Sequence, residues 1–101
     1  MIVVNGHFEM EDDGAVEAVR PALVKFQAAC QAESGCHDYT FSVELGSPNI
    51  IRLTERWEDL DALLAHFKQP HMADMRNAMT AHPPKSSKVT FFEANEFDPA
   101  R

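Results

Sequence analysis

The chain has 101 residues, of which 45% are hydrophobic and 25% are charged. This length and composition fit one folded domain, residues 1–101, rather than a disordered segment. Nine basic and sixteen acidic side chains give a formal net charge of −7. Nucleic acids and anionic membrane surfaces are bound largely through lysine and arginine, so this charge argues against both as partners.

Cysteine usage and the N-terminal residues bear on the cellular compartment. Residues 1–10 have neither the basic start nor the apolar core of a secretory signal, and no apolar run is long enough for a transmembrane helix. We therefore expect a cytoplasmic protein that has no membrane partner. In that compartment Cys30 and Cys36 are expected to be free thiols rather than a disulfide.

The first two predicted elements are a strand and a helix. Residues 2–9 alternate in side-chain character with a period of two, which predicts a strand. Apolar residues then recur every three or four positions over residues 16–30, which predicts an amphipathic helix capped by an aspartate. Pro21 lies inside this stripe, and we expect a bend or a break there because proline removes a helical hydrogen bond. Gly35 is expected to end the helix in a left-handed conformation.

Two further strands, a broken helix and a last strand follow. Alternation and turn residues predict a hairpin, and a helical stripe interrupted at Pro70 comes after it. The predicted elements are a strand at 37–45, a turn at 46–49, a strand at 50–57, a helix from 60 to 82 and a strand at 89–97.

The order β-α-β-β-α-β predicts a ferredoxin-like α+β fold, with two helices on one face of an antiparallel sheet. Phe91 and Phe92 are consecutive and therefore point to opposite faces of their strand. From this we expect both faces of the sheet to be apolar. The face without helices then needs a cover, and a second copy of the chain supplies it most simply, which predicts a homodimer.

Aromatic and histidine side chains suited to an aromatic ligand occur near the third strand and the second helix. Trp57 is either a core aromatic or a pocket wall that stacks on a substrate. His66 follows Leu63 by one helical turn, so it could reach a pocket rim and act as a general base, or it could hydrogen-bond a carboxylate such as Glu55. Tyr39 is more typical of a packed aromatic with an exposed hydroxyl than of a proton donor.

The candidates for contact with a substrate are Tyr39, His71, Met72, Met75 and Arg76, and Asn5 joins His66 and Trp57 as a catalytic candidate. Met72 and Met75 belong to a soft apolar stripe that is either core or the lining of an adaptable pocket, and Arg76 lies beside them. On the first strand, Asn5 could orient a substrate oxygen or satisfy a backbone group at an interface.

No cofactor site is predicted. His66 and His71 stand five residues apart across Pro70, which is not the i,i+4 spacing that places two metal ligands on one helical face. No third ligand is evident from the sequence, so we expect no metal. No glycine-rich phosphate loop is present, so we expect no flavin or other nucleotide cofactor. If His66 is not the base, His71 is the alternative.

Three segments, in their order and spacing, resemble the antibiotic biosynthesis monooxygenase family. Residues 33–39 (ESGCHDY) resemble its "EpGc..Y" segment, residues 51–59 (IRLTERWED) resemble its "i.l.E.W.d" strand, and residues 64–72 (LAHFKQPHM) resemble its "l..Hf...pH" helix. The resemblance runs from about residue 1 to about residue 97. It implies a dimeric α+β barrel, in which two sheets face each other and each subunit has a pocket between its own sheet and helices.

The resemblance also implies an activity. Enzymes of the family oxidise aromatic polyketides, anthrones or quinols with molecular oxygen and without metal or flavin, and Trp57 matches a tryptophan of the anthrone-oxidising branch. Haem oxidation is not expected: Asn5 fits that branch, but His66 stands in place of its tryptophan and Arg76 near its histidine. We therefore expect a cofactor-independent monooxygenase of a small aromatic phenol, quinol or anthrone. The alternatives are a non-catalytic dimeric ligand-binding protein and a cofactor-free isomerase.

Overall fold

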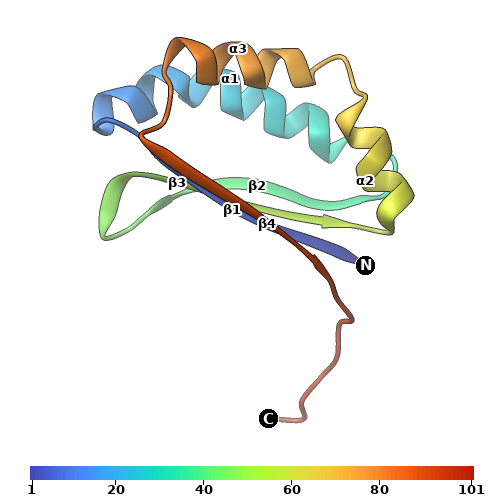
Figure 1. Cartoon of the computed structure of the whole chain (residues 1–101). Coiled ribbons are helices and arrows are strands. Elements are labelled where there is room, and N and C mark those ends of the chain that lie inside the picture. The colour runs from blue at the N-terminus through green and yellow to red at the C-terminus, as the bar shows by residue number, and fades with distance from the viewer.

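A four-stranded antiparallel sheet carries three helices on one of its faces in the computed structural model, which describes residues 1–101 (Figure 1). The strand order is β2-β3-β1-β4, which is the ferredoxin-like order, so the predicted fold class is confirmed. The expected second helix is divided at Pro70 into two. The elements are β1 (Ile2–Glu9), α1 (Asp13–Gln31), β2 (Cys36–Glu44), β3 (Ser47–Trp57), α2 (Leu60–Phe67), α3 (Met72–Ala81) and β4 (Ser86–Glu93).

Helix α1 lies along the sheet and buries the apolar stripe predicted for it. Asp12 caps its first turn, because the carboxylate accepts a hydrogen bond from the Ala15 N–H at 2.8 Å. The expected break at Pro21 is wrong: the helix is continuous from Asp13 to Gln31. Pro21 and Glu17 both lie on the exposed side, so water can hydrate the carbonyl that loses its partner. The buried residues of α1 are Val16, Val19, Leu23, Phe26 and Cys30.

Gly35 shapes the turn from α1 into β2 instead of ending the helix. The helix is capped earlier, at Ala32, which keeps a right-handed conformation. Gly35 has a φ of +79°, and its carbonyl accepts the Glu58 N–H at 2.8 Å. A Cβ at this position would lie 2.7 Å from the Ala62 Cβ. Only glycine therefore lets this turn pass so close to the start of α2.

The β2–β3 hairpin turns earlier than the sequence predicts. The connection consists of Leu45 and Gly46 alone, and β3 already begins at Ser47. The reason is a contact between residues far apart in the sequence. The Met10 N–H donates to the Asn49 carbonyl at 2.8 Å, and the Asn49 side-chain amide donates to the Met10 carbonyl at 3.1 Å. This pairing extends β3 into the region that we expected to be a turn.

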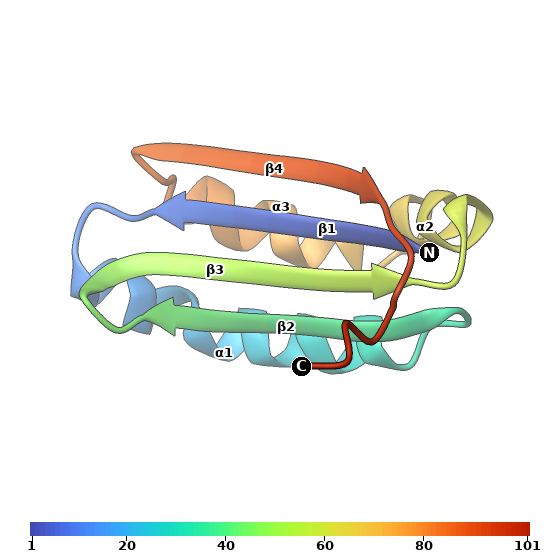
Figure 2. The same cartoon turned by 90° about the horizontal axis from the view of Figure 1, so that it is seen from below.

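Strand β4 also begins and ends before its predicted bounds of 89–97. It pairs with the whole of β1, from Glu9 opposite Ser86 to Ile2 opposite Glu93. Beyond Glu93 one more backbone bond continues the pairing, from the Ala94 N–H to the Met1 carbonyl at 2.9 Å. Residues 94–101 then leave the body of the domain on the side of the free sheet face (Figures 1 and 2).

The two faces of the sheet differ more than the sequence predicts. On the helix face, the side chains of β1 and β3 form the core, with Val4, Leu53 and Trp57 at most 5% exposed. The other face carries no helix (Figure 2), and the pleat and register place mainly polar residues there. The expectation of two apolar faces is therefore corrected. The free face consists of Val3, Asn5, His7, Glu9, Asp38, Thr40, Ser42, Glu44, Ile50, Arg52, Thr54, Arg56, Ser86, Lys88, Thr90 and Phe92.

None of the three helices is long and apolar enough to cross a membrane. Helices α1 and α3 pack against each other above the sheet, and α2 lies at one end of it (Figure 1). Strand β4 is almost entirely exposed, so the helix layer leaves this edge of the sheet uncovered.

Gly35→Ala tests the turn beside α2. The substitution forces a left-handed alanine and a clash with Ala62, so we expect a loss of about 1–3 kcal/mol in the free energy of unfolding, measured with urea. Gly46→Ala is the matched control, because nothing lies within 4 Å of its Cβ and the backbone there has no positive φ. Equal stability of the two variants would contradict this account of the turn.

Candidate functional site

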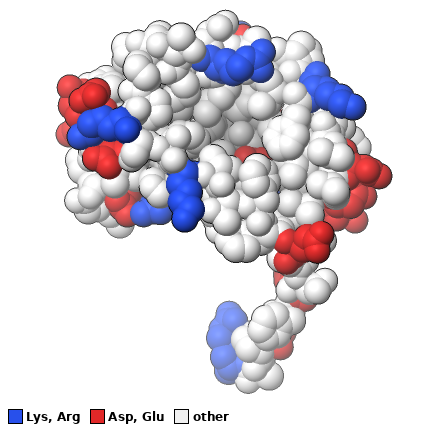
Figure 3. All heavy atoms as spheres, in the orientation of Figure 1, with Lys and Arg blue, Asp and Glu red and all other residues white.

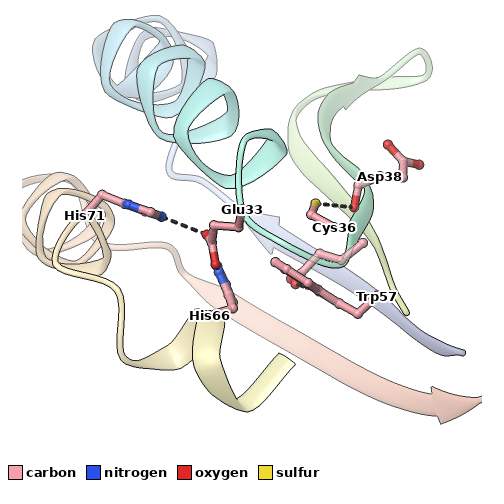
Figure 4. Close-up of polar contacts among 7 residues, drawn as sticks. Glu33, Cys36, Asp38, Trp57, His66 and His71 are labelled. Atoms are coloured by element: carbon pink, nitrogen blue, oxygen red, sulfur yellow. Dashed lines mark hydrogen bonds and ion pairs between the residues drawn. The ribbon is translucent and has the colours of Figure 1, made fainter. Parts of the chain in front are cut away.

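One buried carboxylate joins three segments of the chain (Figure 4). Glu33, just after α1, places Oε2 2.9 Å from Nδ1 of His66 on α2 and 2.8 Å from Nε2 of His71 at the start of α3. The side chain of Glu33 is 7% exposed, that of His66 is 2% exposed and that of His71 is 20% exposed. The one oxygen therefore accepts from two imidazole N–H groups away from bulk water.

The break between α2 and α3 is what lets both histidines reach Glu33. After Phe67 the chain forms a tight turn, in which the N–H groups of Lys68 and Gln69 donate to the carbonyls of Ala65 and His66, each at 3.1 Å. Pro70 follows and cannot donate a helical hydrogen bond. A spacing of five residues keeps two side chains apart only within one continuous helix. Across the break the two rings converge.

Aromatic rings hold the histidines in place. The His66 ring stacks against Trp57, with centroids 4.7 Å apart and planes inclined by 34°. Tyr39 lies 5.5 Å from the His66 ring, and Phe26 makes an edge contact with His71 at 5.6 Å. These contacts leave the rings little freedom to turn away from Glu33.

Trp57 and His66 occupy the structural alternatives given for them rather than an open pocket wall and a pocket rim. Trp57 is fully buried and donates its Nε1–H to Oε1 of Glu55 at 2.8 Å, so it is a core aromatic and does not form an open wall for substrate stacking. His66 is buried too, rather than at a pocket rim. The carboxylate that binds it is Glu33 and not Glu55, because Glu55 is engaged by Trp57.

Burial controls the protonation of the groups around the histidines. It raises the pKa of Glu55, against the opposing effects of the Trp57 hydrogen bond and of His66. Burial, followed by the charge of Glu33, raises the pKa of the Cys30 thiol. The pKa of Tyr39 is raised as well, first by burial and then by Glu55. The phenol therefore stays protonated, which agrees with its reading as a packed aromatic.

The second thiol lies at the entrance to β2. Its Sγ contacts the backbone oxygen of Asp38 at 3.6 Å, and burial raises the pKa of Cys36 to about 11. Cys30 and Cys36 are both free, as predicted. Of the two, only Cys30 lies with Glu33, His66 and His71, and their four ligand atoms are all within 4.8 Å of one another.

A hollow opens between α3 and the sheet on the side where β4 is the edge (Figure 3). Between α2 and β4, Phe67 meets Phe91 edge-on at 6.3 Å, and both rings are about half exposed. Met72 and Met75, which the sequence marked as pocket candidates, are partly buried against the core. Acidic atoms are visible inside the hollow.

Two of the predicted site residues lie elsewhere. Asn5 is exposed on the free face of the sheet, between Thr54 and Thr90 of the neighbouring strands, so the sheet separates it from the histidines. Asn5 therefore does not share a site with His66, contrary to our expectation. Its position on the free face fits the alternative, in which Asn5 lies at an interface. Arg76 is exposed on α3 and forms no ion pair with an acidic side chain.

Sequence reasoning missed Glu33 and Cys30 as members of the site. The sequence indicates Cys30 only as part of the buried stripe of α1, and Glu33 only as one residue of the ESGCHDY segment. Their spacing of three residues at the end of a helix was the available signal, because it places both side chains on one side of the last turn.

The chain is similar to known proteins in both sequence and structure. The sequence model of the family described as "antibiotic biosynthesis monooxygenase" matches residues 1–78. No curated protein is significantly similar in sequence.

Solved structures match over nearly the whole chain. A Deinococcus radiodurans protein described as an antibiotic biosynthesis monooxygenase is 28% identical, with a TM-score of 0.86 over 97% of this chain and 96% of that one. A protein of Mycobacterium tuberculosis is 24% identical, with a TM-score of 0.81 over 95% and 96%. A conserved protein of Methanosarcina mazei is 20% identical, with a TM-score of 0.83 over 93% and 92%. The family match covers most of the chain, and the chain belongs to the antibiotic biosynthesis monooxygenase family.

Proposed function

We propose that this protein is a cofactor-independent monooxygenase of a small aromatic phenol, quinol or anthrone-type substrate. Membership of the family supports monooxygenation. The observation that carries the rest of the proposal is the carboxylate of Glu33 between two histidines on the helix side of the sheet, where the half-exposed rings of Phe67 and Phe91 also meet. A planar aromatic ligand suits exposed rings of this kind, since aromatic and methionine side chains bind flat apolar surfaces well.

His71 is the group that we assign as the general base. Its Nε2–H donates to Glu33, which leaves Nδ1 with a free lone pair, and Nδ1 does not cap helix α3. His66 makes the corresponding bond through Nδ1, but its side chain is only 2% exposed, whereas that of His71 is 20% exposed. A substrate can therefore reach His71 more directly, and His66 serves to hold Glu33 in place. We therefore assign the general base to His71, the alternative to His66.

Glu33 improves the base in two ways. As an acceptor it selects the imidazole tautomer whose free nitrogen can take a proton. As a negative charge it stabilises the imidazolium that forms when the proton arrives. A carboxylate that orients a histidine is the same arrangement that other enzymes use to prepare a general base.

The chemistry balances without a redox cofactor. For a methylene between aromatic rings, the base removes a proton, and the carbanion passes electrons to O2. The carbanion forms a C–O bond to O2 and takes back the proton on oxygen, which gives a hydroperoxide. The base then removes the second proton from the same carbon while the O–O bond breaks, and the departing hydroxide takes up that proton to become water, which leaves a ketone. One oxygen atom enters the product and the other leaves as water, while the substrate carbon supplies all four electrons. The protein contributes deprotonation, orientation and exclusion of water.

His71→Gln tests this assignment by oxygen uptake with a panel of quinols and anthrones across pH 5–9. Loss of a general base typically lowers the rate about 10²–10⁴-fold, so we expect kcat to fall by that factor. The variant should remain folded. Labelled O2 should place one labelled atom in the product.

Two variants serve as controls. His82→Gln is the same substitution at an exposed histidine that caps the end of α3, and it should leave kcat unchanged. His66→Gln keeps an N–H that can donate to Glu33, and it should cost less than His71→Gln. Full activity of His71→Gln would contradict the assignment of the base. Turnover of the panel without O2 would contradict the oxygenase and favour an isomerase, and binding without any turnover would favour a ligand-binding protein.

We also propose that two copies associate through the free face of the sheet. No helix covers that face (Figure 2). Its apolar side chains include Phe92, which is 47% exposed and lies opposite Val3 on the neighbouring strand. Most of the remaining residues are polar, so hydrogen bonds and ion pairs would contribute much of such an interface.

Light scattering at micromolar concentration should give twice the chain mass of 11.3 kDa. Phe92→Asp places a charge in the proposed interface and should shift the mass toward one chain. Leu45→Asp is the control, because Leu45 is fully exposed in the β2–β3 turn and is outside the proposed interface. The mass of one chain for the wild type would overturn the proposal.

A further inference from the structure

The four residues around Glu33 combine the donor types that bind a transition metal. Cys30 offers a sulfur that becomes a thiolate when it gives up its proton to a metal, Glu33 a carboxylate oxygen, and His66 and His71 one imidazole nitrogen each. All four donor atoms lie within 4.8 Å of one another, and Cys30 and His66 are buried. A set of two nitrogens, one sulfur and one oxygen suits Zn²⁺ and similar borderline ions better than Ca²⁺ or Mg²⁺.

The charge of this region also favours a cation. Glu33 is 7% exposed, and its ion-pair partners are only the two histidines. A second carboxylate, Glu55, is buried on the same side of the sheet, and no lysine or arginine pairs with either acid. Buried carboxylates are expensive unless a positive charge is close. A divalent ion among these donors would supply that charge.

The histidine and carboxylate donors require only a small adjustment. Around a tetrahedral zinc ion, with bonds of about 2.0–2.3 Å, neighbouring donor atoms stand roughly 3.3–3.7 Å apart. The two histidine nitrogens are now 2.9 and 2.8 Å from Oε2 of Glu33, the separation of direct hydrogen bonds. Each ring would therefore move outward by about half an ångström, and the metal would replace the two shared protons.

We infer that Cys30, Glu33, His66 and His71 form a four-coordinate site for a divalent transition-metal ion of the zinc class. The inference does not rest on the proposed reaction, because metal binding is measured without substrate. It revises the expectation of no metal site, which rested on the five-residue spacing of His66 and His71 across Pro70 and on the lack of an evident third ligand. Four protein ligands leave no position for water, so the bound ion stabilises the fold and does not activate a substrate.

Metal binding has a consequence for the base. Nε2 of His71 would hold the metal, so the proton of the neutral ring would move to Nδ1, the nitrogen that accepts a proton in the proposed reaction. The same Glu33 carboxylate would be occupied by the ion. Zinc is therefore expected to inhibit turnover while it raises the temperature of unfolding.

The test is a titration of the purified, tag-free full chain with Co²⁺ and then Zn²⁺. Cobalt in a tetrahedral site with a thiolate shows an intense visible spectrum and a sulfur-to-cobalt band in the near ultraviolet. We expect both to saturate at one ion per chain and to disappear when Zn²⁺ displaces the cobalt. Zn²⁺ alone should also raise the unfolding temperature.

Variants locate the site. Cys30→Ala should remove the sulfur-to-cobalt band and weaken binding by more than the roughly 10–100-fold that loss of a second-shell partner costs. Cys36→Ala is the matched control: Cys36 is the other free thiol and lies outside the cluster, so the cobalt spectrum should persist. His71→Ala removes a partly exposed ligand and should weaken binding with little effect on the core. Circular dichroism confirms that each variant is folded.

Three results would overturn the inference. One is the absence of stoichiometric cobalt or zinc binding to the folded wild type. Another is a cobalt spectrum that Cys36→Ala abolishes and Cys30→Ala leaves intact. The third is binding that His71→Ala does not weaken. A failure to bind metal would leave the proposed oxygenase intact, because its test measures oxygen uptake.

Discussion

The interaction on which the site depends is the sharing of one buried carboxylate oxygen by two histidines. Glu33 receives an N–H from His66 and another from His71, at 2.9 and 2.8 Å. A charged acceptor makes such bonds stronger than neutral ones, and burial removes the competing water. Loss of either donor would leave a buried carboxylate incompletely satisfied. The bonds therefore tie the end of α1 to α2 and to the start of α3.

The fold is arranged so that these three segments meet. Gly35 lets the turn after α1 pass close to Ala62 at the start of α2. The interruption between α2 and α3 at Pro70 brings the two histidines to the same point. Trp57 closes the site from the sheet, since it stacks on His66 and is itself held by Glu55. One arrangement therefore supports two chemistries: a prepared base when protons bridge the cluster, and a cation site when a metal replaces them.

Much of the architecture follows from local sequence patterns. The order of strands and helices, the apolar stripe of α1 and the division near Pro70 all reflect side-chain periodicity and turn residues, and the structure confirms them. The ends of β3 and β4 do not follow, because contacts far apart in sequence set them, such as Asn49 with Met10. The continuity of α1 through Pro21 depends on which side of the helix meets solvent.

The site was predictable only in part, for the same reason. Its aromatic and histidine members were identified by residue type, and Trp57, Tyr39, His66 and His71 do lie together. Their partner Glu33 stands 33 residues before His66, and only the folded chain brings the two together. Asn5 was misplaced because periodicity shows that alternate residues share a face of the strand, and not which face the helices cover.

The central claim is that Glu33 holds the two histidines as complementary tautomers, and nitrogen NMR of the imidazole rings tests it directly. At a pH where both rings are neutral, long-range ¹H–¹⁵N spectra should show His66 protonated at Nδ1 and His71 protonated at Nε2, and Glu33→Gln should weaken both preferences. The opposite tautomers, or two rings whose spectra do not respond to Glu33→Gln, would contradict the account.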